Sequence, residues 1–131
     1  MTPQETKDLV VHTWQMFCKG DLKGAFANMS DDVTWLSPGN LPDLSGPHPG
    51  KAGIVELMRK VITVFPEGLG MEIRKTYCDG NSVIIELIDF GKVYNGKYYE
   101  NELCFVFQVK DGKICHIREY GDTQKVSEII S

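Results

Sequence analysis

Several features that mark common functional classes are missing from this sequence. It has no run of basic residues, and a net charge of −4 with a pI near 5.3 argues against nucleic-acid binding. No apolar stretch approaches the roughly 18 residues that a membrane span needs. The start, MTPQETKDLV, has neither a basic flank nor an apolar core. We therefore expect no signal peptide and a cytoplasmic protein.

Cysteine and histidine are few and scattered. The cysteines form no CxxC pair, which favours free thiols in a reducing compartment. The histidines form no HxxxH or HExxH motif, so we predict no metal site and no cofactor. These residues are Cys18, Cys78, Cys104 and Cys115, and His12, His48 and His116.

The first thirty residues have helical periodicity. Thr2 and Glu5 frame a capping box with proline at the first helical position. Gly20 ends this helix, and Asp21 caps a second, short helix that we extend to Met29.

A strand, a loop and a third helix follow. Alternation of Val33 and Trp35 in DDVTWLS predicts a short strand. Residues 37–50 are rich in proline and glycine, which predicts a loop with little helix or strand. Apolar residues at helical spacing then run from Ile54 until proline ends the helix at Pro66.

The second half changes to strand character. Three hairpin signals spaced 16 residues apart predict an antiparallel meander of four long strands. The signals are Asp79-Gly80, Asn95-Gly96 and Asp111-Gly112. The predicted strands are about 69–78, 82–94, 97–110 and 113–121. Strands of this length twist and curl, usually with bulges.

These elements predict one α+β domain over residues 1–131, of a size and composition ordinary for a soluble globular protein. Its antiparallel sheet would be cone-shaped and strongly curved, wrapped on three N-terminal helices. Such a cone leaves a pocket at its open end.

The element order resembles the nuclear-transport-factor-2-like (NTF2-like) superfamily, a cystatin-like roll. The likeness rests on DDVTWLSPG, on GPHPGKAGIVELM, and on ENELCFVFQVKDGKICHIREYGDT. The last segment resembles the C-terminal signature of the SnoaL-like polyketide-cyclase branch, which has limonene-epoxide-hydrolase and ketosteroid-isomerase relatives. The resemblance implies a ligand pocket and a homodimer formed through the sheet.

The resemblance also implies roles for single positions. Ser37 stands where ketosteroid isomerases have their base, and Phe105 where they have the acid that holds the oxyanion. Asp89 and Glu119 match the two acids of the epoxide hydrolases. Leu87 stands where those enzymes have arginine, and Trp35 and Ser37 replace their tyrosine and asparagine.

Asp89 and Glu119 are the candidate catalytic carboxylates. Asp89 has the parity of Val83, Ile85 and Leu87, so it should face the interior near the end of its strand. A desolvated carboxylate has a raised pKa that suits proton transfer. Alternatively, a bulge turns Asp89 outward, or Lys92 pairs with it.

Glu119 shares its parity with Cys115 and Ile117. If the two acids converge, coupling raises one pKa and gives one acid and one base. A salt bridge or a dimer contact is the alternative for Glu119. Tyr120 is a third catalytic candidate, as a donor to an oxyanion, although a strand tyrosine commonly only packs.

Several other side chains have weaker claims. Asp122 is better explained as the N-cap of a helical turn in TQKVSEII than as a third acid. His48 either gates the pocket mouth or is solvated. His116 faces the surface or a dimer partner, with a role in the site as the alternative. The apolar residues that we expect around a flat or apolar ligand, each with a core role as the alternative, are Trp14, Phe17, Trp35, Met58, Leu87, Phe105 and Phe107.

Three functions follow from this pattern. The first is an isomerase, cyclase or hydrolase that uses carboxylate acid/base chemistry on a small apolar organic molecule. The second is a binding module with the same pocket and no turnover. The third is a dimeric interaction protein with a vestigial pocket.

Overall fold

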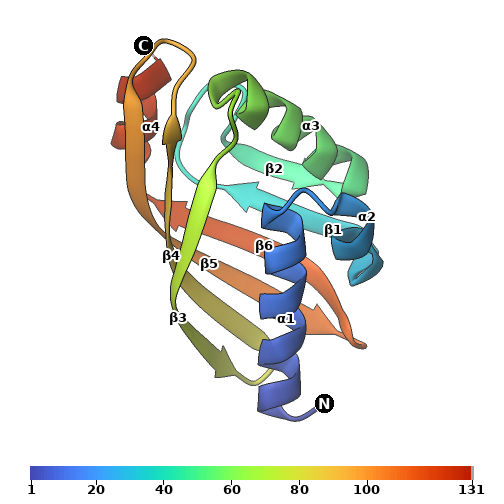
Figure 1. The fold of residues 1–131 in the computed structure, drawn as a ribbon. Helices are drawn as coiled ribbons and strands as arrows, with labels where there is room; N and C mark the ends of the chain where they lie inside the picture. The colour runs from blue at the N-terminus through green and yellow to red at the C-terminus, as the bar shows by residue number, and fades with distance from the viewer. Residues whose placement is uncertain (131) are drawn as a thin grey trace.

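The computed structural model describes residues 1–130, so the last residue of the predicted domain lies outside the described residues. It confirms an α+β fold with a curved open sheet (Figure 1). Within residues 1–130 the helices are α1 (Pro3–Cys18), α2 (Leu22–Ala27), α3 (Gly50–Val64) and α4 (Thr123–Ile130). The strands are β1 (Met29–Ser37), β2 (Gly46–Pro49), β3 (Gly70–Asp79), β4 (Ser82–Lys92), β5 (Tyr98–Lys110) and β6 (Lys113–Gly121).

The N-terminal helices follow the sequence signals, with one correction. The capping box forms: Glu5 N donates to Thr2 Oγ1 at 3.1 Å, and Thr2 N donates to Glu5 Oε1 at 2.8 Å. The extension of the second helix to Met29 is wrong. Met29 begins β1, where it is almost wholly buried and pairs with Ile114 of β6.

The segment predicted as a loop contains a short strand. β2 pairs antiparallel with β1, and His48 lies opposite Trp35. This strand lies at the edge of the sheet and contains two prolines. Proline has no backbone N–H to donate, which an edge strand tolerates because only one of its sides is paired. The prediction of a loop with little helix or strand therefore needs correction at residues 46–49, which form β2.

The meander is confirmed, and all three hairpins lie where the glycine signals place them. Only the last has the predicted type I′ turn, with φ of 53° at Asp111 and 75° at Gly112. In the first hairpin Asp79 still pairs with Ser82, so the two-residue loop is shifted by one position. The second hairpin has a longer loop, residues 93–97.

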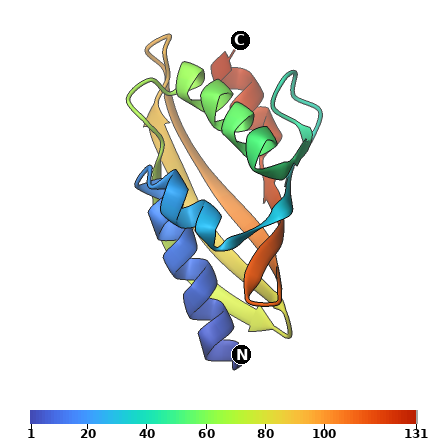
Figure 2. The same ribbon diagram turned by 90° about the vertical axis from the view of Figure 1, so that its right-hand side faces the viewer.

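The sheet order within the described residues is β2-β1-β6-β5-β4-β3, and β1 pairs with β6 in parallel. Register shifts in the β1–β6, β3–β4 and β5–β6 pairs accompany the strong curvature. Helices α1 and α3 lie on the same side of the sheet, α1 across β3 and β4, and α3 across β1 and β2 (Figure 2).

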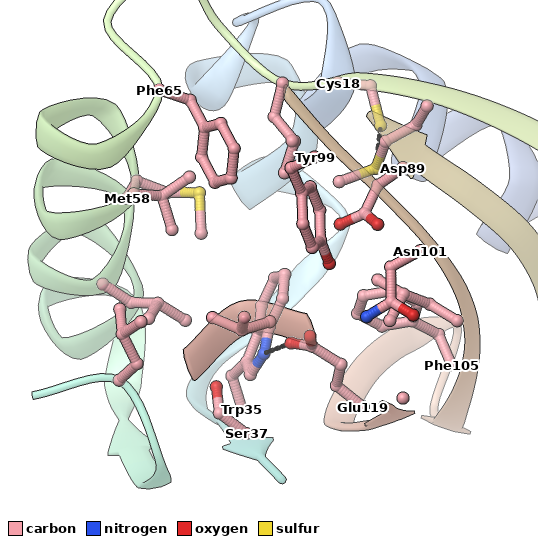
Figure 3. A pocket seen from close by; sticks show the side chains of 18 of the residues that line it. Cys18, Trp35, Ser37, Met58, Phe65, Asp89, Tyr99, Asn101, Phe105 and Glu119 are labelled. Atoms are coloured by element: carbon pink, nitrogen blue, oxygen red, sulfur yellow. Dashed lines mark hydrogen bonds between the residues drawn. The ribbon is translucent and has the colours of Figure 1, made fainter. Parts of the chain in front are cut away.

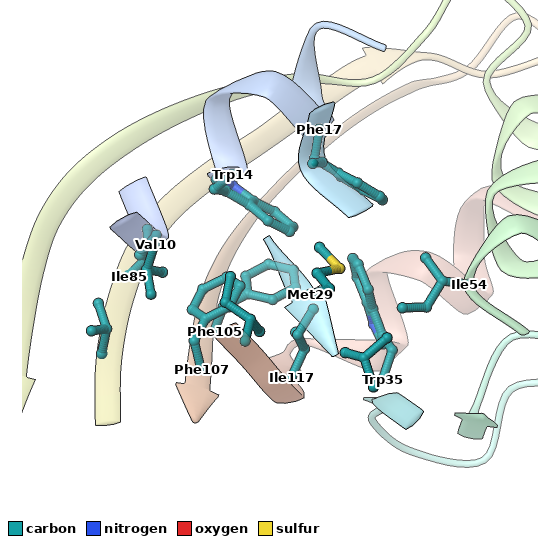
Figure 4. Packing of buried hydrophobic residues seen from close by; sticks show 14 of the residues in the cluster. Val10, Trp14, Phe17, Met29, Trp35, Ile54, Ile85, Phe105, Phe107 and Ile117 are labelled. Carbon is teal, nitrogen blue, oxygen red and sulfur yellow. The ribbon is translucent and has the colours of Figure 1, made fainter. Parts of the chain in front are cut away.

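A cluster of aromatic side chains packs between α1 and the inner face of the sheet (Figure 4). Trp14 of α1 is 4.6 Å from Phe105 and 5.4 Å from Phe107, measured between ring centroids. Phe17 and Trp35 continue the cluster toward α3, with ring centroids 5.6 Å apart. Three of these rings, Phe17, Trp35 and Phe105, also line the cavity at the open end of the cone.

The four cysteines are free thiols, as predicted. Among residues 1–130, no helix has the length and apolar character to cross a membrane.

Candidate active site

A cavity of about 470 Å³ lies at the open end of the cone (Figure 3). Its walls come from α3, from the inner face of the sheet, and from the start of α4. Apolar side chains dominate, among them Met58 from α3, Phe65 directly after α3, and Phe105 from β5. Polar groups are confined mainly to the sheet side, so a ligand would meet them at one end of an apolar chamber.

Asp89 faces this cavity from β4. Alternation along the strand turns it inward with Leu87, and it lies opposite Asn101 of β5. The side chain is only 4% exposed, and its Oδ1 has no hydrogen-bond partner among the described residues. Burial raises the pKa of Asp89 to about 7, although a hydrogen bond with the Tyr99 hydroxyl opposes this rise.

Glu119 faces the same cavity from β6. It lies opposite Phe105, and Trp35 Nε1 donates a hydrogen bond to its Oε1 at 3.1 Å. Burial raises the pKa of Glu119 to about 7, while the bond from Trp35 acts in the opposite direction. The residue is partly exposed because its carboxyl group borders the cavity rather than solid core.

The two carboxyl groups interact. The charge on Glu119 is a further cause of the raised pKa of Asp89. Near neutral pH, such a pair favours holding one proton between its members, which leaves one proton donor and one proton acceptor. Both therefore have the protonation behaviour that general acid/base catalysis needs.

Comparison with known proteins identifies the relatives of this fold. The profile of the SnoaL-like domain matches residues 10–117. The chain belongs to the SnoaL-like domain family. A comparison with curated protein sequences gives no significant match.

Solved structures share the fold of this SnoaL-like domain along nearly its whole length. An NTF2-like protein from Burkholderia xenovorans is 26% identical, with a TM-score of 0.84 and coverage of 100% of this chain and 99% of that chain. An NTF2-like protein of unknown function from Burkholderia pseudomallei is 20% identical, with a TM-score of 0.90 and coverage of 100% and 99%. TerC, co-crystallized with polyporic acid, is 24% identical, with a TM-score of 0.86 and coverage of 97% and 99%.

In this SnoaL-like domain, four of the apolar residues expected around a ligand line the cavity: Phe17, Trp35, Met58 and Phe105. Three others lie elsewhere, so their expected place at a ligand needs correction. Trp14, Leu87 and Phe107 are almost wholly buried in the core beneath the cavity, because the sheet and α1 close over them.

Tyr120 also needs correction. Strand alternation places it on the opposite face of β6 from Glu119, and its side chain is 51% exposed. It is outside the cavity lining, so it has no route to a ligand held there.

Two buried residues that sequence reasoning left out of the site line the cavity. Tyr99 and Asn101 share the inward face of β5, and each is 3% exposed. Burial and the Asp89 charge raise the pKa of Tyr99, so its hydroxyl remains a proton donor. The signal that could have found them is register, since Asn101 is directly opposite Asp89 across the hairpin.

The remaining candidates have structural positions. Asp122 Oδ1 accepts from Gln124 N at 3.0 Å at the start of α4, as expected of a cap, while the residue also borders the cavity. His48 is buried rather than solvated, and its ring bonds to the Leu44 carbonyl, which keeps it from acting as a mobile gate. Among the described residues, no group of three or more His, Cys, Asp or Glu side chains could hold a metal ion.

Proposed function

We propose that this protein is an acid/base enzyme that acts on a small, largely apolar organic molecule bound in the cone. The observation that carries this proposal is the pair Asp89 and Glu119, two carboxyl groups with pKa values raised to about 7 in one apolar cavity. A solvent-exposed carboxylate with a purely structural role would keep a pKa near its ordinary value.

Hydrogen bonding and charge together support one assignment of roles within the pair. Tyr99 bonds to Asp89 as Trp35 does to Glu119, but the Glu119 charge raises the pKa of Asp89. Trp35 Nε1 donates to Glu119, and a donor of this kind stabilises the ionised carboxylate, so Glu119 acts as the base. Asp89 has an oxygen without a partner beside that negative charge, so Asp89 carries the shared proton and acts as the acid. Tyr99 and Asn101 stand beside Asp89 and orient the polar end of the ligand.

In this scheme Glu119 removes a proton from a carbon or from a water next to the substrate, while Asp89 delivers a proton to a substrate oxygen. An isomerisation, a cyclisation or the addition of water uses the same two transfers. The apolar walls keep the carboxyl groups desolvated, which maintains their pKa values near the working pH.

A ligand screen followed by solvent exchange tests this function. Terpenoids, steroids and aromatic polyketides, both neutral and amine-bearing, are screened by thermal shift, and each binder is then incubated with enzyme in D₂O. We expect one class to bind and to gain deuterium or to be converted, as seen by mass spectrometry. Asp89→Asn and Glu119→Gln should still bind the ligand and lose the conversion. Binding without exchange or conversion in any class would refute catalysis.

A non-catalytic binding module is the second candidate, and one observation favours it. Leu87 occupies the position at which the epoxide hydrolases that the sequence resembles have arginine, and it is buried in the core. No cation therefore orients a carboxylate from that position. The third candidate, a vestigial pocket, is disfavoured because the cavity is not filled by side chains.

A further inference from the structure

The charged side chains that line the cavity are all acidic. Asp89, Glu119 and Asp122 border it, and the described lining residues include no lysine, arginine or histidine. The other ionisable groups that face it are the Cys18 thiol from α1 and the Tyr99 hydroxyl from β5, and neither supplies positive charge. A ligand in this space meets acceptors and negative charge without a protein cation to balance them.

One acceptor in this wall has no partner. Asp89 Oδ1 is buried without a hydrogen bond within the described structure, and Figure 3 shows the carboxyl group pointing into the space beside Tyr99. Leaving a buried acceptor unpaired costs about 1–3 kcal/mol. When Asp89 is ionised, a ligand that donates a hydrogen bond at this point recovers that cost.

Aromatic rings also line the cavity. Phe65 and Tyr99 have ring centroids 5.3 Å apart, and Trp35 and Phe105 have ring centroids 5.6 Å apart. All four residues line the cavity. Ring faces attract cations and interact weakly with anions, which adds to the preference set by the carboxyl groups.

From these observations we infer that the cavity selects an apolar ligand with a protonated amine at one end, and rejects carboxylates and phosphates. The ammonium group pairs with Asp89 and Glu119, and the apolar part of the ligand lies against α3. This inference rests on the proposed function only in placing a ligand in this cavity, and it names the chemical class of that ligand.

An isosteric series measured by titration calorimetry tests the inference. The probes are 4-phenylbutylamine, 4-phenylbutan-1-ol and 4-phenylbutanoate, which share one apolar skeleton and differ in charge. For the unmodified protein at pH 8 we expect the amine to bind at least tenfold more tightly than the alcohol, and the carboxylate to bind most weakly. The amine's affinity should fall severalfold at pH 6, because protonation of Asp89 and Glu119 removes the charge that pairs with it.

Variants identify the source of the preference. Asp89→Asn and Glu119→Gln should each reduce the amine's advantage over the alcohol severalfold. Tyr120→Phe, on the outer face of the sheet, is the matched control and should retain the full advantage. A circular dichroism melt of each variant separates loss of the preference from loss of the fold.

The inference fails if the alcohol or the carboxylate binds as tightly as the amine, or if the amine does not bind. Because these measurements need no turnover, they are independent of catalysis. Amine selectivity without any conversion would refute the proposed function alone. Conversion of a neutral substrate without amine selectivity would refute this inference alone.

Discussion

At the scale of single residues, strand parity explains why both candidate carboxylates were predicted from the sequence. Alternation with Leu87 and Ile117 determined the direction of Asp89 and Glu119, and the structure places both at one cavity. Parity could not show that Leu87 and Phe107 lie too deep to reach a ligand. Depth along a curved strand depends on which helix covers it, and that information is not local in the sequence.

Replacing Asp89 by asparagine should stabilise the fold at alkaline pH. The pKa of Asp89 rises from its ordinary value of 3.8 to about 7 on folding, so the native state keeps a proton that the unfolded chain releases. Stability therefore falls as pH rises from about 4 to about 7, and no further above it. Asp89→Asn removes this loss, which amounts to about 2–4 kcal/mol for a shift of this size.

Urea unfolding at pH 5 and at pH 8 measures the effect. The free energy of unfolding of the variant, relative to that of the unmodified protein, should be higher at pH 8 than at pH 5. Asp43→Asn, at an exposed loop position, is the control. An equal difference at both pH values would show that Asp89 does not titrate in this range.

Replacing Trp35 by phenylalanine should raise the pKa of Glu119 further. The indole N–H bond to Oε1 lowers this pKa, and phenylalanine keeps an aromatic ring while removing the donor. Carbon-13 NMR titration of the glutamate carboxyl groups measures the change, which we expect to be about one unit. The pH dependence of catalytic activity should shift to higher pH together with this pKa. An unchanged titration of Glu119 would refute the role that we give to Trp35.

At the scale of elements, the hairpins were predictable because glycine marks each turn, whereas the long-range pairings were not. The parallel pairing of β1 with β6 joins segments about 80 residues apart, and no local pattern specifies it. β2 was missed because its prolines signal a loop unless the strand is known to lie at the edge. Eight-residue α4 was recognised only as a helical turn.

Helix α4 forms one wall of the cavity and packs outside the main core. Ile129 packs with Phe65, Val93 and Tyr99 in a second cluster separate from the main core. The chain leading into the helix is fixed by Asn101, whose Nδ2 donates to the Asp122 carbonyl at 3.1 Å.

Ile129→Ala should loosen this wall and leave the rest of the sheet intact. Loss of a buried isoleucine costs about 2–4 kcal/mol, concentrated here in one peripheral cluster. Hydrogen exchange followed by mass spectrometry should show faster exchange in residues 123–130 and unchanged protection in β5. Ile62→Ala, at an exposed position on α3, is the control. Equal loss of protection throughout the chain would show that α4 unfolds only with the whole domain.

At the scale of the whole molecule, the outer face of the sheet exposes several large apolar side chains. It carries Tyr77 and Tyr120, which are 37% and 51% exposed, and partly exposed Ile84 and Val106 between them. The homodimer that the sequence resemblance implies would cover this face, and it remains a prediction.

We expect Ile84→Asp to convert a dimer to a monomer, because it places a carboxylate between Tyr77 and Val106, where burial at an interface would desolvate it. Light scattering after gel filtration measures the mass of each form. Tyr94→Asp, in the loop between β4 and β5, is exposed and should leave the mass unchanged. A monomeric unmodified protein at micromolar concentration would refute the dimer.

The contact between Trp35 and Glu119 also gives the protein an optical reporter. The chain has two tryptophans, whose ring centroids are 5.7 Å apart, so excitation of the core residue Trp14 passes readily to Trp35 at the cavity. Emission should therefore respond as one signal to whatever occupies the cavity and to the charge on Glu119. Fluorescence of the unlabelled protein can then follow ligand entry in real time, even before the natural ligand is known.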